Sequence, residues 1–196
     1  MALHIYGDSK SGNCLKVKWT AQHLGIPYVW TELNVLNADT RTPEFLAKNP
    51  VGQVPLVILN DGRPLAQSNA ILLHLADDSA LIPADAYDRA RMLEWLFWEQ
   101  YSHEPYIAVA RFQMFYLGRP KTDLDAKLYE RGGAALKRMD EALATSAFLV
   151  GNTLTLADIS LVAYTRVAHQ GGFDLADYPA VAAWVARVEA ALPITD

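Results

Sequence analysis

The chain has 196 residues, of which 52% are hydrophobic, so it is long enough to bury the core of one large domain or two small ones, and we expect two. A formal net charge of -5 without any run of like charges excludes the strongly basic face that nucleic acid or an anionic membrane requires. The single cysteine, Cys14, excludes an internal disulfide, and the apolar runs are shorter than the ~20 residues of a membrane span. We therefore expect a soluble, cytoplasmic protein, and the spacing of the histidines and carboxylates predicts no metal site.

Short β-rich segments alternate with helical ones in residues 1–79. The segments LHIY at 3–6 and YVWTELN at 28–34 are typical of strands, and the stretch between them is typical of a helix that ends before Gly25. The turn at Asp61 and Gly62 joins PLVIL at 55–59 to RPLAQ as a hairpin, which predicts a mixed sheet. The pattern indicates an α/β domain with a thioredoxin-like layer in the order βαβαββα.

The pattern changes to helical spacing after Pro83. Apolar residues recur at that spacing over 85–117, 124–143, 156–168 and 180–192. The sequence TLADISL begins one of these helices with Thr155 as the N-cap and Asp158 three residues later, so we expect Asp158 to be structural. We predict an N-terminal domain at 1–79, a linker at 80–86 and an all-helical domain at 87–196.

Two motifs in the first part favour a small, acidic, peptide-like ligand. In NPVGQVPLV, Pro55 stands where a strand should begin, and it removes a ladder donor, so the peptide groups of Val54 can face an incoming backbone. In QSNAILLHL, Ser68 stands where a helix should start and offer N–H groups to a carboxylate. The Gly- and Ser-rich turn in YGDSKSGNCLKVKW, before the first helix, would offer further N–H groups and hydroxyls to an anion.

Together these motifs resemble the glutathione site of the glutathione transferases, and the resemblance extends over essentially the whole chain. It implies that Val54 and Pro55 pair with the cysteinyl backbone, and that Gln67 and Ser68 hold the γ-glutamyl end. It also implies that Gln53 reaches the glycyl carboxylate or the cysteinyl backbone, and that Lys48 and Arg41 lie near the glycyl end. The activity that follows is attack of a glutathione thiolate on an electrophilic small molecule, with glutathione as co-substrate.

The resemblance suggests a donor to the thiolate. SGNCLKVK is similar to the serine-bearing segments of Phi and Zeta enzymes, which implies Ser11, and the Thr-x-Asn arrangement of Nu-like members implies Asn13 as second candidate or joint donor. Ser9 and Tyr6 remain weaker alternatives. Ser11 and Asn13 could instead merely cap the helix. A donated hydrogen bond and a helix terminus together supply the roughly 3 kcal/mol that lowers a thiol pKa by ~2 units.

Two neighbouring features are expected to be structural. Cys14 lies three residues after Ser11 and lacks a C-x-x-C partner, so we expect a buried, inert thiol. Lys16 and Lys18 continue the same helix. The resemblance implies a basic residue with a structural role at the first position, and a solvated helix face is the default expectation for both.

The second substrate is expected against the aromatic helix around residues 99–116. Tyr106, Arg111 and Phe115 are the candidate lining residues, and Pro105 is expected to bend the helix. Alternative functions on the same scaffold are glutathione-dependent reduction of disulfides or peroxides, isomerisation, and non-catalytic or regulatory glutathione binding. The resemblance also implies a homodimer, to whose contact the apolar residues of 89–97 could contribute.

Overall fold

The computed structural model describes residues 2–194. The chain divides into two compact units, one that extends to Ser79 and one from Ala80 to Ile194. Each unit is described by itself below.

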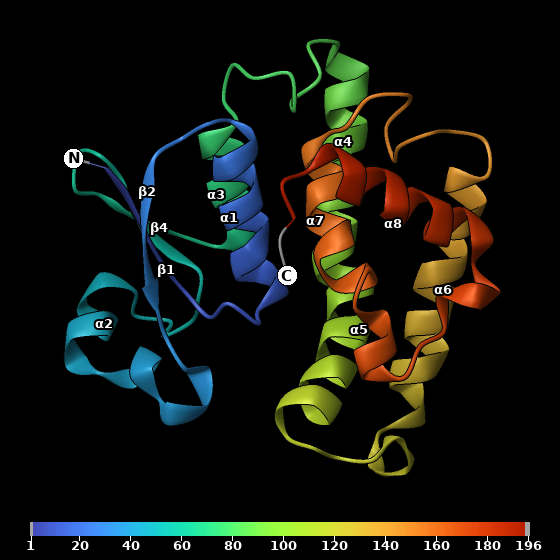
Figure 1. Ribbon diagram of the computed structural model, residues 1–196, viewed down its shortest axis with the longest axis horizontal. Helices are drawn as coiled ribbons and strands as arrows, with labels where there is room; N and C mark the ends of the chain where they lie inside the picture. Colours follow the sequence, from blue (N-terminus) through green and yellow to red (C-terminus); the bar gives the residue numbers. More distant parts are fainter. Residues whose placement is uncertain (1, 195–196) are drawn as a thin grey trace. The chain divides into compact units, whose positions relative to one another are not determined.

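A mixed four-stranded sheet forms the centre of the N-terminal unit (Figure 1). The elements in chain order are β1 Leu3–Gly7, α1 Gly12–His23, β2 Tyr28–Glu32, α2 Pro43–Lys48, β3 Leu56–Ile58, β4 Pro64–Ala66 and α3 Ser68–Leu75, with short 3-10 turns at Val35–Asn37 and Asp39–Arg41. The strand order is β2-β1-β3-β4, in which β1 and β2 are parallel and the other neighbours are antiparallel. The predicted thioredoxin-like arrangement is confirmed.

The β3–β4 hairpin turns where the sequence predicts it. Gly62 has a φ of +88°, a backbone conformation that a residue without a side chain adopts at little cost, and its amide donates to the Leu59 carbonyl at 2.9 Å. Val57 of β3 pairs with Leu65 of β4 on one side and with Ile5 of β1 on the other. This arrangement keeps β3 in the middle of the sheet, where it is buried.

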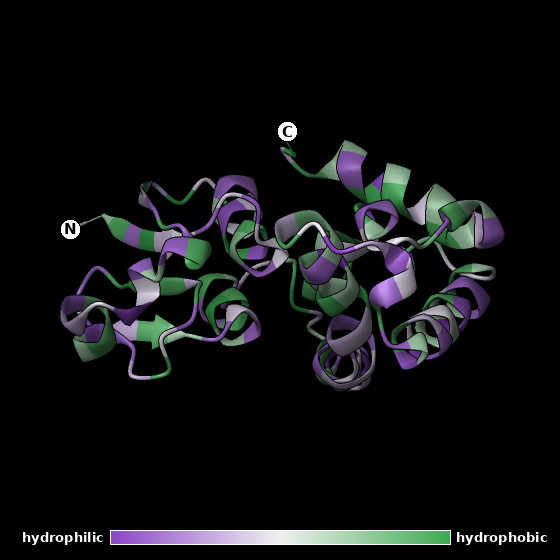
Figure 2. Ribbon diagram, turned by 90° about the horizontal axis from the view of Figure 1, so that it is seen from below, coloured by the Kyte–Doolittle hydropathy of each residue, from purple (hydrophilic) through white to green (hydrophobic). Residues whose placement is uncertain are grey.

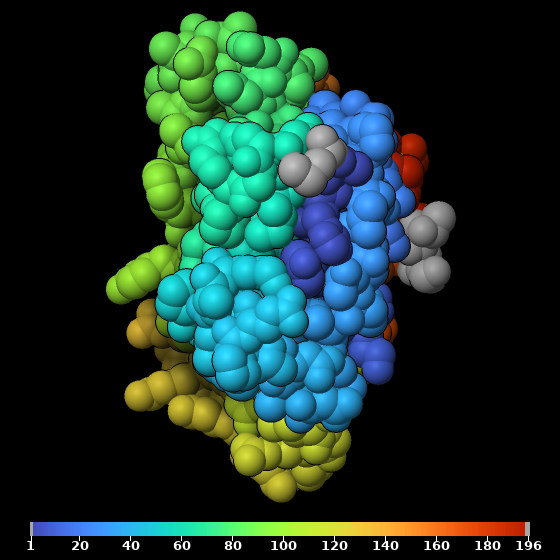
Figure 3. All heavy atoms as spheres, turned by 90° about the vertical axis from the view of Figure 1, so that its left-hand side faces the viewer, coloured from blue at the N-terminus to red at the C-terminus, as the bar shows by residue number. Residues whose placement is uncertain are grey.

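Helices α1 and α3 pack against each other on one side of the sheet (Figure 1). Val17 and Ile71 on these helices are completely buried, as are Ile5 and Val57 on the central strands. These residues form the core on which the starts of both helices are held. In the space-filling view of Figure 3, α2 and the loop that follows it lie at the surface, in cyan, beside the dark blue of β1.

The second unit is helical. Its elements are α4 Ala86–Trp98, a π-helical turn Glu99–His103, α5 Glu104–Arg111, a π-helical turn Phe112–Tyr116, α6 Ala126–Leu143, α7 Leu156–Thr165 and α8 Pro179–Ala191, with 3-10 turns at Lys121–Asp123, Ala168–Gly171 and Leu175–Asp177. Pro105 lies in the first turn of α5, directly after the first π-helical turn, so the irregularity occurs where the proline removes a backbone donor. Figure 2 shows hydrophobic and hydrophilic residues alternating along these helices, as expected where one face is buried.

Asp158 does more than the predicted capping. Its Oδ2 accepts the amide of Thr155 at 2.9 Å and the Thr155 hydroxyl at 3.0 Å, which confirms its place in the helix start. Its Oδ1 accepts the amide of Leu149 and the indole N–H of Trp184 of α8, each at 2.9 Å. Burial raises the pKa of Asp158, and these four donated hydrogen bonds oppose that rise. One carboxyl group thus joins α7, α8 and the loop before α7.

Candidate functional site

Three segments of the N-terminal unit converge at one end of the sheet. The register pairs Tyr6 of β1 with Leu56, and Leu56 with Ala66 of β4. Continuing both ladders by two residues brings Val54 toward Asp8 on one side and toward Ser68 on the other. We call the residues of 8–13, 53–55 and 67–68 the sheet-end site.

Val54 presents unused backbone groups at this site. It precedes β3 and joins Pro55 through a cis peptide bond, and among residues 2–194 its amide and carbonyl have no hydrogen-bond partner. Val54 as a whole is half-buried. An extended backbone can pair with such groups as a neighbouring strand would.

The loop before Val54 is held by a side chain that the sequence analysis did not single out. Asn49 is buried, donates from its amide nitrogen to the Gln53 carbonyl at 2.8 Å, and accepts the Val51 amide at 3.3 Å. Arg41 donates to the Val51 carbonyl at 3.2 Å. The loop therefore has a defined conformation, with the exposed Gln53 beside Val54.

Ser11 occupies the N-cap position of α1, yet its hydroxyl makes no capping hydrogen bond. The hydroxyl instead hydrogen-bonds the sulfur of Cys14. Sulfur is a weak acceptor, so this bond can be exchanged for one to a better acceptor at modest cost. The simple capping role is therefore not what the Ser11 side chain performs.

Asn13 connects the starts of α1 and α3. Its Oδ1 accepts a hydrogen bond from the Lys16 ammonium at 2.7 Å and another from the Ser68 hydroxyl at 3.1 Å. Ser68 and Lys16 are both buried, and Lys16 has no exposed area at all. The expectation that Lys16 lies on a solvated face is wrong, because its ammonium is turned inward to Asn13 rather than outward to water. Lys18 is half-buried, with its ammonium 5.8 Å from the centre of the Trp30 ring.

The two weaker donor candidates are engaged elsewhere. The amide and hydroxyl of Ser9 both donate to Oε1 of Glu32, each at 2.9 Å. Burial opposes ionisation of Glu32, but hydrogen bonds from Ser9 and Trp30 outweigh it and lower the pKa of that carboxyl. Tyr6 stacks on His4 with ring centres 4.3 Å apart and meets the edge of Phe45 of α2, so its ring lies on the α2 side of the sheet.

Cys14 is a core residue rather than a surface thiol. It has no exposed area, and burial raises its pKa to about 12 in spite of hydrogen bonds from Ser11 and from the Asp8 amide. A thiol in this state is protonated at neutral pH and is not a nucleophile.

Two further candidates of the N-terminal unit are Lys48 of α2 and Gln67 of the sheet-end site. Lys48 forms an ion pair with Glu44 one helical turn away, at 2.6 Å, and its ammonium lies 5.6 Å from the centre of the Tyr6 ring. Gln67 is exposed and has a φ of +70° and a ψ of +112°, an unusual backbone conformation for a residue with a side chain. Such conformations are found preferentially at ligand-binding positions.

The structure separates the three residues predicted to line the second-substrate pocket. Arg111 is buried, donates to Gln170 at 2.7 Å, and lies 4.6 Å from the centre of the Phe115 ring, so these two lie together. Tyr106 lies instead on a groove toward α6. A separate apolar hollow of about 340 Å³ opens on another face of α5, where its lining includes Pro105, Ala108, Val109, Phe112 and Tyr164.

Comparison with known proteins identifies the family. Residues 1–77 match the glutathione S-transferase N-terminal domain, and residues 96–191 match the glutathione S-transferase C-terminal domain. Mouse glutathione S-transferase theta-3 is 34% identical over 204 residues, which cover 97% of this chain and 83% of that protein. The chain belongs to the glutathione S-transferase family.

A solved structure and another protein are also similar to this chain. A crystal structure of a glutathione S-transferase from Pseudomonas fluorescens Pf-5 shares 48% sequence identity and a TM-score of 0.93, over 96% of this chain and 95% of that one. Protein URE2 of Candida glabrata is 28% identical over 92% of this chain and 62% of its own length. The predicted family and fold are confirmed.

The sequence analysis did not assign a role at the site to Asn49, Glu32 or Lys16. Asn49 and Lys16 act through residues two to four positions away, whereas Glu32 holds Ser9 from 23 residues away. Within residues 2–194, no cluster of three or more His, Cys, Asp or Glu side chains could hold a metal ion. In the same part of the chain, none of the helices has the length and apolar character needed to cross a membrane.

Proposed function

We propose that this protein is a glutathione transferase that binds glutathione at the sheet-end site and activates its thiol for attack on an electrophilic small molecule. The observation that carries the proposal is the convergence of three complementary groups. Unpaired peptide groups at Val54, a buried hydroxyl at Ser68 and the start of α1 at Ser11 lie at the same end of the sheet. A tripeptide with a thiol in its middle residue and carboxylates at its ends needs groups of these kinds.

The orientation of the ligand follows from the chemistry of each group. The cysteinyl backbone of glutathione pairs with the Val54 amide and carbonyl, as the resemblance implies. The γ-glutamyl carboxylate meets the start of α3 and accepts the Ser68 hydroxyl, which turns to it from Asn13 Oδ1, while the exposed Gln67 reaches its amino group. Gln53, Arg41 and Lys48 lie nearer the glycyl end.

The thiol is activated by donors at the start of α1. The Ser11 hydroxyl turns from the Cys14 sulfur to the thiolate, which is a stronger acceptor because it carries charge. A charge-assisted hydrogen bond contributes about 1.5 to 3 kcal/mol and the helix terminus about 0.3 to 1 more, enough to lower a thiol pKa by about two units. Asn13 assists, and its side chain is kept in place by the Lys16 ammonium.

The chemical step is a substitution or addition at carbon. The thiol proton leaves to solvent, the thiolate forms a carbon–sulfur bond, and the leaving group, where the electrophile has one, departs with its electron pair. The apolar hollow at Ala108 and Phe112 suits the electrophile better than the vicinity of Arg111, because Arg111 is already bound to Gln170. As in the family generally, we propose that the protein works as a homodimer.

The state of Cys14 disfavours a cysteine-based reductase. Mixed-disulfide chemistry needs an accessible thiolate, whereas Cys14 is fully buried with its pKa raised to about 12. A non-catalytic glutathione-binding protein would have the same ligand-binding groups but would show no turnover.

The deciding experiment follows the ultraviolet absorption of bound glutathione thiolate as pH is varied, together with turnover of chlorodinitrobenzene. We expect the thiolate band to persist to about two pH units below its range in free glutathione, and to shift back in Ser11→Ala. A band unchanged in Ser11→Ala but lost in Asn13→Ala would move the donor role to Asn13. If the thiol of bound glutathione keeps its free-solution pKa and no turnover is seen, the protein only binds glutathione and the transferase proposal is refuted.

A further inference from the structure

The apolar hollow of the helical unit, where the proposed function places the electrophile, carries formal charge of one sign. Its apolar lining is formed by Pro105, Ala108, Val109, Phe112 and Tyr164. Two polar side chains, Gln100 and Glu104, complete the lining. Among these described residues none is Lys, Arg or His, so the one formal charge in the lining is that of the Glu104 carboxylate. We call this cavity the α5 hollow.

The Glu104 carboxylate is held at the α5 hollow by a neighbouring amide. The amide nitrogen of Gln100 donates to Oε2 of Glu104 at 2.5 Å and to Oε2 of Glu99 at 2.7 Å. Glu99 has no exposed area, so its bond to Gln100 attaches that amide to the interior of the unit. Glu104 itself is half-buried in the first turn of α5. Its charge is therefore fixed beside apolar surface and is screened less than the charge of an exposed side chain.

Aromatic rings in the same lining also favour a positive charge. Phe112 stacks on Tyr116 with ring centres 5.1 Å apart, and 40% of Phe112 remains exposed. The ring of Tyr164 is contributed by α7. The face of an aromatic ring is electron-rich and attracts a cation, most strongly for quaternary ammonium groups, which are weakly hydrated. A carboxylate and two rings together suit a cationic, partly apolar molecule.

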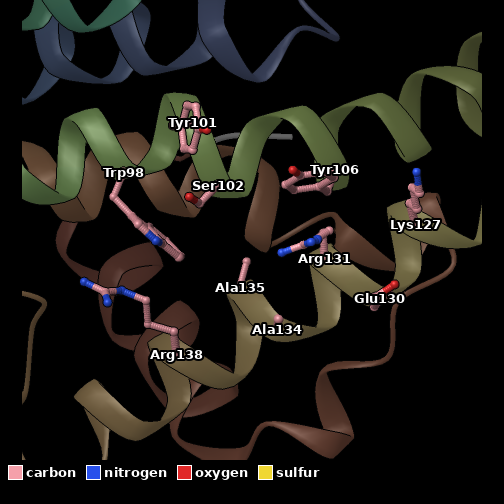
Figure 4. Close-up of a pocket in the computed structure, with 10 residues that line it drawn as sticks. All are labelled: Trp98, Tyr101, Ser102, Tyr106, Lys127, Glu130, Arg131, Ala134, Ala135 and Arg138. Atoms are coloured by element: carbon pink, nitrogen blue, oxygen red, sulfur yellow. The ribbon is translucent and has the colours of Figure 1, made fainter.

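Another cavity of the helical unit has the opposite charge. A groove of about 530 Å³ lies between α6 and the segment formed by α4 and α5, and three cations, Lys127, Arg131 and Arg138, line it against one carboxylate, Glu130 (Figure 4). The sign of the charge thus changes from one cavity of the unit to the next. The negative charge of the α5 hollow is a local property of its lining and not a consequence of the net charge of -5.

We propose that Glu104 makes the α5 hollow selective for electrophiles that carry a positive charge and against acidic ones, an inference that rests on the proposed transferase function. The apolar body of the electrophile lies against Ala108 and Val109, and its cationic group lies between the Glu104 carboxylate and the Phe112 ring. An acidic group at the same place would lose hydration and meet a like charge. Glu104 contacts the substrate away from the reacting carbon, so it determines specificity and takes no part in bond formation.

The test compares turnover of chlorodinitrobenzoate, its methyl ester and its choline ester by the whole protein with glutathione. The three compounds differ at one substituent, which is an anion, a neutral group or a quaternary ammonium. In each, the thiolate forms the carbon–sulfur bond and chloride leaves with its electron pair. Each kcat/KM is divided by the rate constant of the uncatalysed reaction, because the substituents activate the ring unequally. We expect this ratio to be about tenfold or more higher for the choline ester than for the benzoate, with the methyl ester between them.

Two variants show whether Glu104 sets this order. Glu104→Gln removes the charge and keeps an oxygen that can accept from Gln100, so the three ratios should come within about twofold of one another. A merely structural role of Glu104 would instead lower all three ratios alike and keep their order, which would refute the proposal. The matched control is Glu141→Gln, which removes an equal charge from an exposed position of α6 outside the hollow and should keep the order.

A binding measurement distinguishes this inference from the proposed transferase function. Dinitrobenzoate and its choline ester lack chlorine and cannot react, so calorimetry measures their affinities whether or not the protein has turnover. Turnover with equal ratios in the wild type would refute the role of Glu104 and leave the transferase proposal unaffected. Absence of turnover, with tighter binding of the choline ester that is lost in Glu104→Gln, would refute the transferase and support the selectivity of the hollow. Absence of both turnover and binding would refute both.

Discussion

The most informative single perturbation is removal of the buried thiol, Cys14→Ala. The pKa of this thiol rises from 9.0 to about 12 on folding, because burial disfavours the thiolate. Above pH 9 the unfolded chain releases the proton while the folded protein keeps it, so ionisation favours the unfolded state. The contribution of Cys14 to stability is therefore fully present below pH 9 and is lost as the pH rises toward 12.

The magnitude follows from the difference between the two pKa values. One pKa unit corresponds to about 1.4 kcal/mol, so the wild type should lose about 2 kcal/mol of unfolding free energy at pH 10.5 that Cys14→Ala does not lose. Over the whole interval the loss would approach about 4 kcal/mol. Tyrosine and lysine titrations affect both proteins alike and cancel in the comparison.

The assay is urea denaturation of wild type and Cys14→Ala between pH 7 and 10.5, with reductant present. We expect the stability difference to fall steadily above pH 9, and the wild-type thiol to resist a disulfide reagent until the protein unfolds. A stability difference that stays constant over this range, or rapid labelling of the folded protein, would refute the reasoning and reopen a redox role for Cys14.

The remaining predictions concern stability and each part of the site. Asp158→Ala should lower the unfolding free energy by at least about 3 kcal/mol in urea denaturation, since it leaves the Leu149 amide and the Trp184 indole without an acceptor. Lys16→Met keeps the buried stem but removes the hydrogen bond to Asn13, so the Kd for glutathione should rise about fivefold or more by calorimetry. Lys18→Met is the control and should change the Kd little. Equal effects of the two variants would argue against a role of the hydrogen bond between Lys16 and Asn13. Ala108→Trp should fill the apolar hollow and raise KM for chlorodinitrobenzene without changing glutathione affinity, and an unchanged KM would place the electrophile elsewhere.

Features set by local chemistry were predictable from the sequence. The Asp61–Gly62 turn needs a residue that adopts positive φ, and Gly62 does so at +88°. The helix start at Thr155 needs an oxygen acceptor three residues later, and Asp158 provides it. Both signals lie within four residues, so they do not depend on how the rest of the chain packs.

Features set by packing were not predictable. Lys16 looks like a solvated helix residue in isolation, yet it is buried and its ammonium donates to Asn13, which also accepts the Ser68 hydroxyl of α3. Arg111 donates a hydrogen bond to Gln170, 59 residues away, and no local signal predicts such a contact. The burial of Cys14 was predicted, but the hydrogen bond that the Ser11 hydroxyl donates to its sulfur was not.

The most direct test of the account is a calorimetric titration of glutathione into the folded protein and into Ser68→Ala. The account predicts saturable heat with one site per chain in the wild type. It predicts an affinity at least tenfold lower in Ser68→Ala, a difference of about 1.4 kcal/mol. Absence of binding to the wild type, or equal affinity for the two proteins, would contradict the claim that the end of this sheet holds the tripeptide.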